Sequence, residues 1–172
     1  FLDELNKVLR DEVRRQPRDV RVQIPEFTDV LDLVRHYRDS GSRNQMLETT
    51  LTCVCQLAAV ISFFGNKTSQ SFASSDSVFA GFCTGLLSAS AVATSQDTLE
   101  LISNALTTVR VAFRIGVKVH GAAQRLSKHG DAAVAQSWTT LIIGAQKEAS
   151  IAALAEFNES KGIPHANQAY IS

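Results

Sequence analysis

Apolar and polar positions alternate with helical spacing through the first 64 residues, and this pattern predicts three helices. The first covers residues 1–15, and the apolar positions on one side of it are Leu2, Leu5, Val8, Leu9 and Val13. The second begins near Phe27 and ends near Gly41. The third covers residues 44–64, where apolar side chains recur so often that a largely buried helix is expected. Residues 14–25 are basic and interrupted by proline, which indicates a surface loop.

The pattern changes in the middle of the chain. After a polar, serine-rich segment, residues 77–82 form a short apolar run that predicts a strand. Small residues dominate 84–93 and predict a tightly packed helix. A long apolar stripe then predicts a helix that runs to about Leu126, with Asp97 and Glu100 as a capping pair at its start.

The last part of the chain has a different order of elements. Its pattern predicts a strand over 138–143, a helix over 145–159 and the start of another strand over 169–172. This order indicates that residues 137–172 begin a second, smaller subdomain, while residues 1–136 form the larger one.

The single strand predicted in the larger part needs neighbours, because a buried strand must pair its backbone N–H and C=O groups. No neighbouring strand is visible in residues 1–136, so we expect the missing strands to lie before Phe1 and after Ser172. Phe1 is also not an initiator methionine, which is consistent with a segment of a longer protein.

Charge and apolar content exclude several classes of partner. The 172 residues carry 17 Lys and Arg against 17 Asp and Glu, so no overall charge draws the chain to nucleic acid or to an acidic membrane. The longest apolar stretches, such as residues 57–64, are far shorter than a membrane span. We therefore expect neither a nucleic-acid partner nor a membrane partner.

The three cysteines indicate a reducing, cytoplasmic setting, because they cannot all pair and do not resemble a disulfide framework. Cys53 and Cys55 are too close together for the usual zinc knuckle, and no matching Cys/His pair follows them. We expect no metal site, and we interpret both residues as small apolar side chains in the core.

Cys83 lies in the sequence Gly81-Phe82-Cys83-Thr84-Gly85, which has the G-x-nucleophile-x-G form of a nucleophile elbow. A sharp strand-to-helix turn lifts such a nucleophile above a sheet, and the flanking glycines remove side chains that would collide there. The following helix directs its positive end at the sulfur, which favours the thiolate. The backbone N–H of Thr84 can supply one half of an oxyanion hole.

The spacing of this motif has two interpretations. In a chain with three cysteines and nine glycines, the pattern arises by chance in about one case in a hundred. The predicted strand before Cys83 and the predicted helix after it favour a nucleophile, whereas a buried structural cysteine explains the residue types equally well. The motif alone leaves both interpretations open.

Residues 81–93, GFCTGLLSASAVA, resemble the active-site segment of the starter-unit acyl-carrier-protein transacylase domain, which begins the non-reducing iterative polyketide synthases of fungi. Four other stretches are similar to the same family, and they are FLDEL at 1–5, LTCVCQL at 51–57, VRVAFRIG at 109–116 and YIS at 170–172. The similarity covers nearly the whole chain.

The resemblance implies an α/β fold, in which the chain forms the helix-rich part of an α/β-hydrolase-like acyltransferase core and then the start of a ferredoxin-like subdomain. It also implies ping-pong chemistry through Cys83. A starter acyl group passes from a coenzyme A or carrier-protein thioester to the cysteine, and then to the phosphopantetheine thiol of an acyl carrier protein. The domain itself binds no cofactor, and its neighbours are ketosynthase and acyltransferase domains.

The family's other catalytic groups have no counterpart in this chain. Its Gly-Asp-Gln-type loop, which helps to form the oxyanion hole, belongs before Phe1, and its catalytic histidine belongs beyond the small subdomain and so outside this chain. None of the four histidines lies in a matching motif, and surface roles are expected for His36, His120, His129 and His165. We expect an incomplete site and an impaired or inactive isolated fragment.

Arg110 and Arg114 follow the nucleophile on the next predicted helix. Malonyl-type enzymes hold a substrate carboxylate with an arginine on this helix, but the register does not match and starter units lack that carboxylate. We interpret both residues as a solvated or ion-paired helix face.

Two other functions remain open from the sequence. The chain can be a catalytically silent docking or scaffold module of a megasynthase, in which Cys83 only packs. It can also be a small hydrolase, although no acid–base partner is found for Cys83. The identity and length of the starter group do not follow from these residues.

Overall fold

The computed structural model describes residues 1–41, 44–65, 78–127, 144–165, 168 and 170. The chain divides into two compact units, Phe1–Asp131 and Ala132–Ser172. Every regular element among the described residues is a helix, in keeping with the helix-rich part of the prediction. The α/β-hydrolase-like core and the ferredoxin-like start are not confirmed by these residues.

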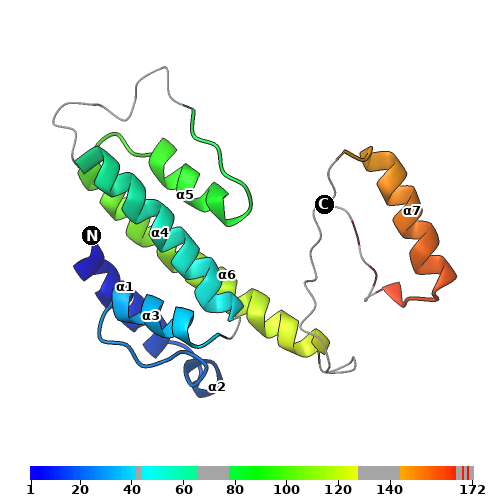
Figure 1. Cartoon of the computed structure of the whole chain (residues 1–172), viewed down its shortest axis with the longest axis horizontal. Coiled ribbons are helices and arrows are strands. Elements are labelled where there is room, and N and C mark those ends of the chain that lie inside the picture. The colour runs from blue at the N-terminus through cyan, green and yellow to red at the C-terminus, as the bar shows by residue number, and fades with distance from the viewer. Residues whose placement is uncertain (42–43, 66–77, 128–143, 166–167, 169, 171–172) are drawn as a thin grey trace. The chain divides into compact units, whose positions relative to one another are not determined.

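Two long helices form the centre of the first unit. They are α4 (Gln45–Gly65) and α6 (Thr98–Ser127), and they lie side by side along much of their length (Figure 1). A Cβ atom on Gly116 of α6 would lie 2.9 Å from the Cα and carbonyl oxygen of Met46 on α4. Only glycine therefore allows the two backbones to approach so closely at this point.

Three shorter helices, α1 (Leu2–Arg14), α2 (Arg18–Arg21) and α3 (Val30–Asp39), precede this pair. The apolar side of α1 packs into the core that α4 and α6 form, as its spacing predicts. The helices predicted over 1–15 and up to Gly41 are confirmed. The predicted surface loop over 14–25 is only partly right, because the short helix α2 lies within it.

The fifth helix, α5 (Thr84–Ala93), packs against both α4 and α6 (Figure 1). Its buried residues are small, and they are Ser88, Ala91 and Val92. The next helix begins as its capping pair predicts, since the Glu100 N–H donates to Asp97 Oδ1 at 2.8 Å. The Glu100 carboxylate in turn accepts from the N–H of Gln96 at 2.8 Å, one residue earlier than in the usual reciprocal arrangement.

By length and composition alone, α4 is able to cross a membrane, since it has 21 residues and an 18-residue window with a mean hydropathy of 1.6. The sequence-based expectation that every apolar stretch is too short was therefore wrong for this helix. Core helices of globular proteins meet the same two criteria. The helix α4 packs against both α6 and α5, and its Met46, Cys53 and Leu57 are fully buried.

The structure does not show the strand that the sequence predicts over 77–82. Ser77 lies outside the described residues, and residues 78–82 do not pair as a strand with any other described residues. Val78 is 92% exposed and Phe82 is 77% exposed. An extended segment without a neighbour cannot satisfy its backbone groups by pairing, so this apolar run remains irregular and exposed.

The second unit contains α7 (Lys147–Ser160), where the sequence predicts a helix over 145–159. Asn158 is buried within this unit, whereas Ile151 and Phe157 are about half exposed. The predicted strand over 138–143 and the predicted boundary at Ser137 lie outside the described residues. The same is true of residues 169, 171 and 172, in the last predicted strand.

Candidate functional site

Cys83 forms the turn that leads into α5. Its φ and ψ angles are 55° and −121°, and it is the one residue other than glycine with a positive φ among those the structure describes. The turn is tight, because the Gly85 N–H donates to the carbonyl of Phe82 at 2.9 Å and the Leu86 N–H donates to that of Cys83 at 3.1 Å. Such a conformation is strained in a residue with a Cβ and persists only where its surroundings hold it.

The two glycines of the motif have different roles. A Cβ on Gly81 would lie 2.5 Å from the Leu86 nitrogen and closer still to the Gly85 carbonyl, so only glycine fits there. A Cβ on Gly85 would meet nothing nearer than Gln56 Nε2, at an ordinary contact distance of 3.7 Å. The expectation that both glycines remove colliding side chains is right for Gly81 and wrong for Gly85.

The Cys83 thiol is exposed at the N-terminal end of α5. The Thr84 amide is the first of this ten-residue helix, and the helix dipole presents partial positive charge at that end. Exposed apolar side chains precede and follow the thiol, at Val78, Phe82 and Leu86. An exposed thiol in such a position is reachable by a large thioester, which a buried structural cysteine is not.

The other two cysteines lie on α4 and differ from each other. Cys53 is buried, and burial raises the pKa of its thiol, as expected for a small core residue. Cys55 is exposed, so its interpretation as a core residue was wrong. The cause is helical geometry, because two residues correspond to about 200° of rotation and place these side chains on different sides of α4.

A chain of polar contacts joins α4 to α5 close to the elbow. The Ser88 hydroxyl donates to Gln56 Oε1 at 2.8 Å and lies 3.4 Å from the Cys53 sulfur. Gln56 was not among the site residues predicted from the sequence. The signal available was a long polar side chain in a largely apolar helix.

No histidine is hydrogen-bonded to Cys83 among the described residues. His36 is exposed on α3, where its Nδ1 lies 3.8 Å from Asp32 Oδ1. His120 on α6 is half-buried, burial lowers the pKa of its imidazole, and its Nε2 lies 2.8 Å from Gln23 Oε1. His165 is exposed in the second unit, and His129 lies outside the described residues.

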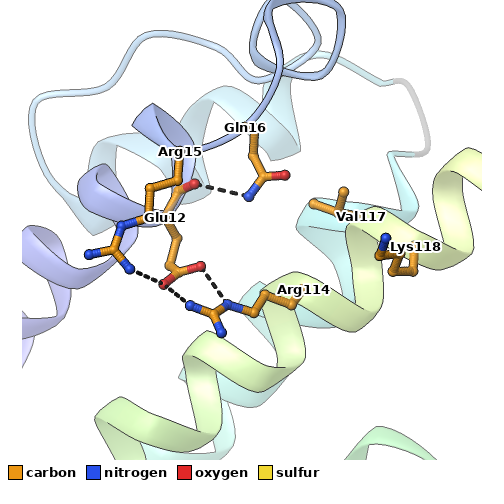
Figure 2. Close-up of a pocket in the computed structure, with 6 residues that line it drawn as sticks. All are labelled: Glu12, Arg15, Gln16, Arg114, Val117 and Lys118. Atoms are coloured by element: carbon orange, nitrogen blue, oxygen red, sulfur yellow. Dashed lines mark hydrogen bonds and ion pairs between the residues drawn. The ribbon is translucent and has the colours of Figure 1, made fainter.

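Arg114 makes an ion pair with Glu12 rather than an open anion site. Its Nε and Nη2 atoms donate to the two carboxylate oxygens of Glu12, each at 2.8 Å (Figure 2). Glu12 is only 2% exposed, and the bond from Arg114 lowers the pKa of its carboxyl. The ion-paired interpretation is confirmed for Arg114, and Arg110 lies exposed on the same helix.

A shallow hollow of about 280 Å³ lies beside this ion pair. Its lining residues are Glu12, Arg15, Gln16, Arg114, Val117 and Lys118 (Figure 2). Glu12 was not among the residues predicted from the sequence, although this acidic residue lies within the apolar stripe of the first helix, which is a signal for a buried ion pair. Clusters of three or more potential metal ligands are absent from the described part of the chain.

Comparison with known proteins shows to which family the sequence belongs. The non-reducing polyketide synthase terA of Aspergillus terreus is 65% identical over all 172 residues, which make up 6% of that protein. PKS1 of Zymoseptoria tritici, also a non-reducing polyketide synthase, is 34% identical over the whole chain. The conidial pigment polyketide synthase PfmaE of Pestalotiopsis fici is likewise 34% identical.

The chain spans 6% to 8% of the length of these relatives. The profile of one family, described as starter unit:ACP transacylase in aflatoxin biosynthesis, matches residues 1–172, the full extent of this sequence. By this match and by its relatives among fungal polyketide synthases, the chain belongs to the starter unit:ACP transacylase family.

Proposed function

We propose that this chain supplies the nucleophile of an acyltransferase that loads a starter acyl group onto an acyl carrier protein in polyketide biosynthesis. The observation that carries the proposal is the backbone of Cys83, an exposed thiol held at φ 55° on the turn into α5. Strained backbone of this kind is concentrated at functional sites. Family membership supports the reaction class, and the elbow geometry supports Cys83 as the residue that performs it.

The first half of the reaction forms an acyl-enzyme. The Cys83 thiol gives up its proton, and its sulfur attacks the carbonyl carbon of a coenzyme A or carrier-protein thioester. The tetrahedral intermediate then breaks its bond to the donor sulfur, and the departing thiolate takes up a proton. Cys83 is left as a thioester, so no energy source and no redox partner is needed.

In the second half, the phosphopantetheine thiol of the carrier protein attacks the same carbonyl carbon. Its proton is removed, the new C–S bond forms, and Cys83 leaves as the thiolate that began the cycle. Both intermediates place negative charge on the former carbonyl oxygen. The Thr84 N–H can stabilise this charge from the N-terminal end of α5.

The remaining catalytic groups belong to other parts of the longer protein in this proposal. A histidine serves as general base, and a second amide completes the oxyanion hole. The strands of an α/β-hydrolase-like core pair with residues 78–82, whose exposed apolar side chains are suited to burial against them. The ferredoxin-like subdomain follows from residue 137 onward.

The test is acylation of the full-length protein that contains this chain, with acetyl-coenzyme A and longer linear acyl-coenzyme A donors. We expect a hydroxylamine-sensitive adduct on the Cys83 peptide, detected by mass spectrometry, and its loss in Cys83→Ala. Cys55→Ala is the matched control, because Cys55 is also an exposed cysteine but lies within a regular helix. Absence of an adduct at Cys83, or equal labelling of Cys55, contradicts the proposal.

Experiments on the same full-length protein distinguish acyl transfer from a docking role and from hydrolysis. Loss of carrier-protein acylation in Cys83→Ala supports transfer through the cysteine. Unchanged carrier acylation and product formation in this variant favours a docking module in which Cys83 has no chemical role. Release of free acid instead of acylated carrier protein favours a hydrolase.

A further inference from the structure

Gln56 on α4 makes a hydrogen bond to the N-terminal half of α5. Its Oε1 accepts from the Ser88 hydroxyl at 2.8 Å, and Ser88 is nearly fully buried. The same hydroxyl lies 3.4 Å from the buried sulfur of Cys53, which fixes the position of Ser88 between the helices. These contacts lie one turn along α5 from the nucleophile.

The other end of the Gln56 amide faces the elbow. Its Nε2 lies 3.7 Å from the point where a Cβ on Gly85 would stand. Gly85 is in the first turn of α5, two residues after Cys83, and its N–H closes the turn by donating to Phe82. The amide oxygen thus accepts from Ser88 in the body of α5, while the amide nitrogen lies beside the first turn.

The rest of the interface explains why this residue matters. The side chains that α5 buries fully are small and its larger Leu87 is only partly buried, so non-directional apolar contact defines the position of the helix weakly. The C-terminal end has an attachment of its own, since Asn104 Nδ2 on α6 donates to Ser95 Oγ at 2.9 Å. Gln56 is the corresponding attachment at the end that carries Cys83.

We infer that Gln56 is a positioning residue for the Cys83 nucleophile, acting through Ser88 and the first turn of α5. Its bond to Ser88 sets where the elbow stands above α4, and its Nε2 dipole faces the turn on which thiolate and oxyanion charge develop. This inference rests on the proposed function. The nearest comparable contact, between Asn104 and Ser95, lies at the far end of α5 and supplies the control.

The experiment measures the rate constant for acylation of Cys83 by acetyl-coenzyme A in the full-length protein. Gln56→Met keeps the length of the side chain and removes both hydrogen-bonding ends, and we expect it to slow acylation about tenfold through misplacement of the nucleophile. Asn104→Ala removes the attachment at the other end of α5, and we expect a rate close to that of the unmodified protein.

A second variant separates positioning from a general loss of stability. Gln56→Glu keeps an oxygen that accepts from Ser88 but presents carboxylate charge where Nε2 now faces the turn. Negative charge near a thiol disfavours the thiolate, so the pH profile of Cys83 alkylation by iodoacetamide shifts to higher pH. A residue that only packs would leave this profile unchanged.

The outcomes are distinguishable from failure of the proposed function. If Cys83 of the unmodified protein takes no acyl group, the proposed function fails before any Gln56 variant is compared. If Cys83 is acylated and Gln56→Met reacts as fast as the unmodified protein, the inference is overturned. It is also overturned if Asn104→Ala slows the reaction equally, or if Gln56→Glu leaves the pH profile unchanged.

Discussion

Helices α1 and α5 both pack on the central pair of helices, but they are held there in different ways. The first contributes large apolar side chains, Leu5, Val8 and Leu9, and one buried carboxylate paired with Arg114. The second fully buries only Ser88, Ala91 and Val92, has Leu87 partly buried against the core, and makes a hydrogen bond from Ser88 to Gln56. One helix is therefore held by buried area, and the other by contacts that depend on position.

The difference reflects what each helix has to do. Apolar burial is non-directional, so a helix held by leucines tolerates small shifts with little loss of free energy. Hydrogen bonds weaken steeply with small displacements, so they suit a helix whose end must hold a nucleophile accurately. The following substitutions test this contrast, in order of decreasing expected effect.

The largest effect is expected at Gly81. Gly81→Ala places a methyl group in overlap with the Gly85 backbone, so the turn cannot form and Cys83 is displaced. We expect acylation of Cys83 to fall about a hundredfold or more. Gly85→Ala, in the same motif, has room for its methyl group, and near-normal acylation is expected. Equal losses in the two variants contradict the geometry described for the elbow.

The next effect concerns the apolar attachment of α1. Leu5 is fully buried, and Leu5→Ala is expected to lower the free energy of unfolding by about 3 kcal/mol because it leaves a cavity. Hydrogen exchange followed by mass spectrometry should show faster exchange in α1, with less change in α5. Leu99→Ala is the control, since Leu99 is 80% exposed and its loss creates no cavity. Equal effects at both leucines would sink the assignment of the core.

A smaller effect is expected from the ion pair between α1 and α6. Arg114→Met removes the two charged hydrogen bonds that the buried Glu12 carboxylate accepts and leaves Arg15 Nη1, 3.7 Å away, as an ion-pair partner. Hydrogen exchange in α1 should become faster, though less than in Leu5→Ala. Adding Glu12→Gln to this variant removes the carboxylate charge that Arg15 alone pairs weakly, and it should restore part of the protection. A double variant less protected than Arg114→Met would contradict this explanation.

The smallest effect appears only in acid. The bond from Arg114 lowers the pKa of Glu12 below its ordinary value of 4.5, so the folded state favours the ionised carboxylate. This contribution to stability is fully present above the ordinary value and is lost as the pH falls through the lowered pKa. Glu12→Gln should therefore reduce the acid sensitivity of unfolding below about pH 4.5, as measured by urea titration at several pH values. An unchanged pH dependence would show that Glu12 does not contribute.

Much of the helical structure could be predicted because helical periodicity is a local property. The apolar stripe of the first helix and the capping pair Asp97 and Glu100 depend only on neighbouring residues, and both predictions are confirmed. Strand formation over 77–82 could not be predicted in the same way. The apolar composition of this segment predicts burial, whereas a strand forms only where another segment pairs with it.

The candidate site, like the fold, could be predicted only in part from the sequence. The spacing of the Gly81–Gly85 motif and the family resemblance both point to Cys83, but the spacing does not distinguish the two glycines. That distinction comes from where the backbone folds back, which places Gly81 against residues 85 and 86. Glu12 and Gln56 were missed because each acts on a residue at least 32 positions away in sequence.

The φ angle of Cys83 also bears on which residue the fold itself would prefer at this position. Glycine adopts that conformation without steric penalty, so Cys83→Gly is expected to make the folded chain more stable while removing the thiol. Selection for stability alone would therefore place glycine at position 83. Under the proposed function, cysteine at this position is a stability–activity trade-off confined to one residue.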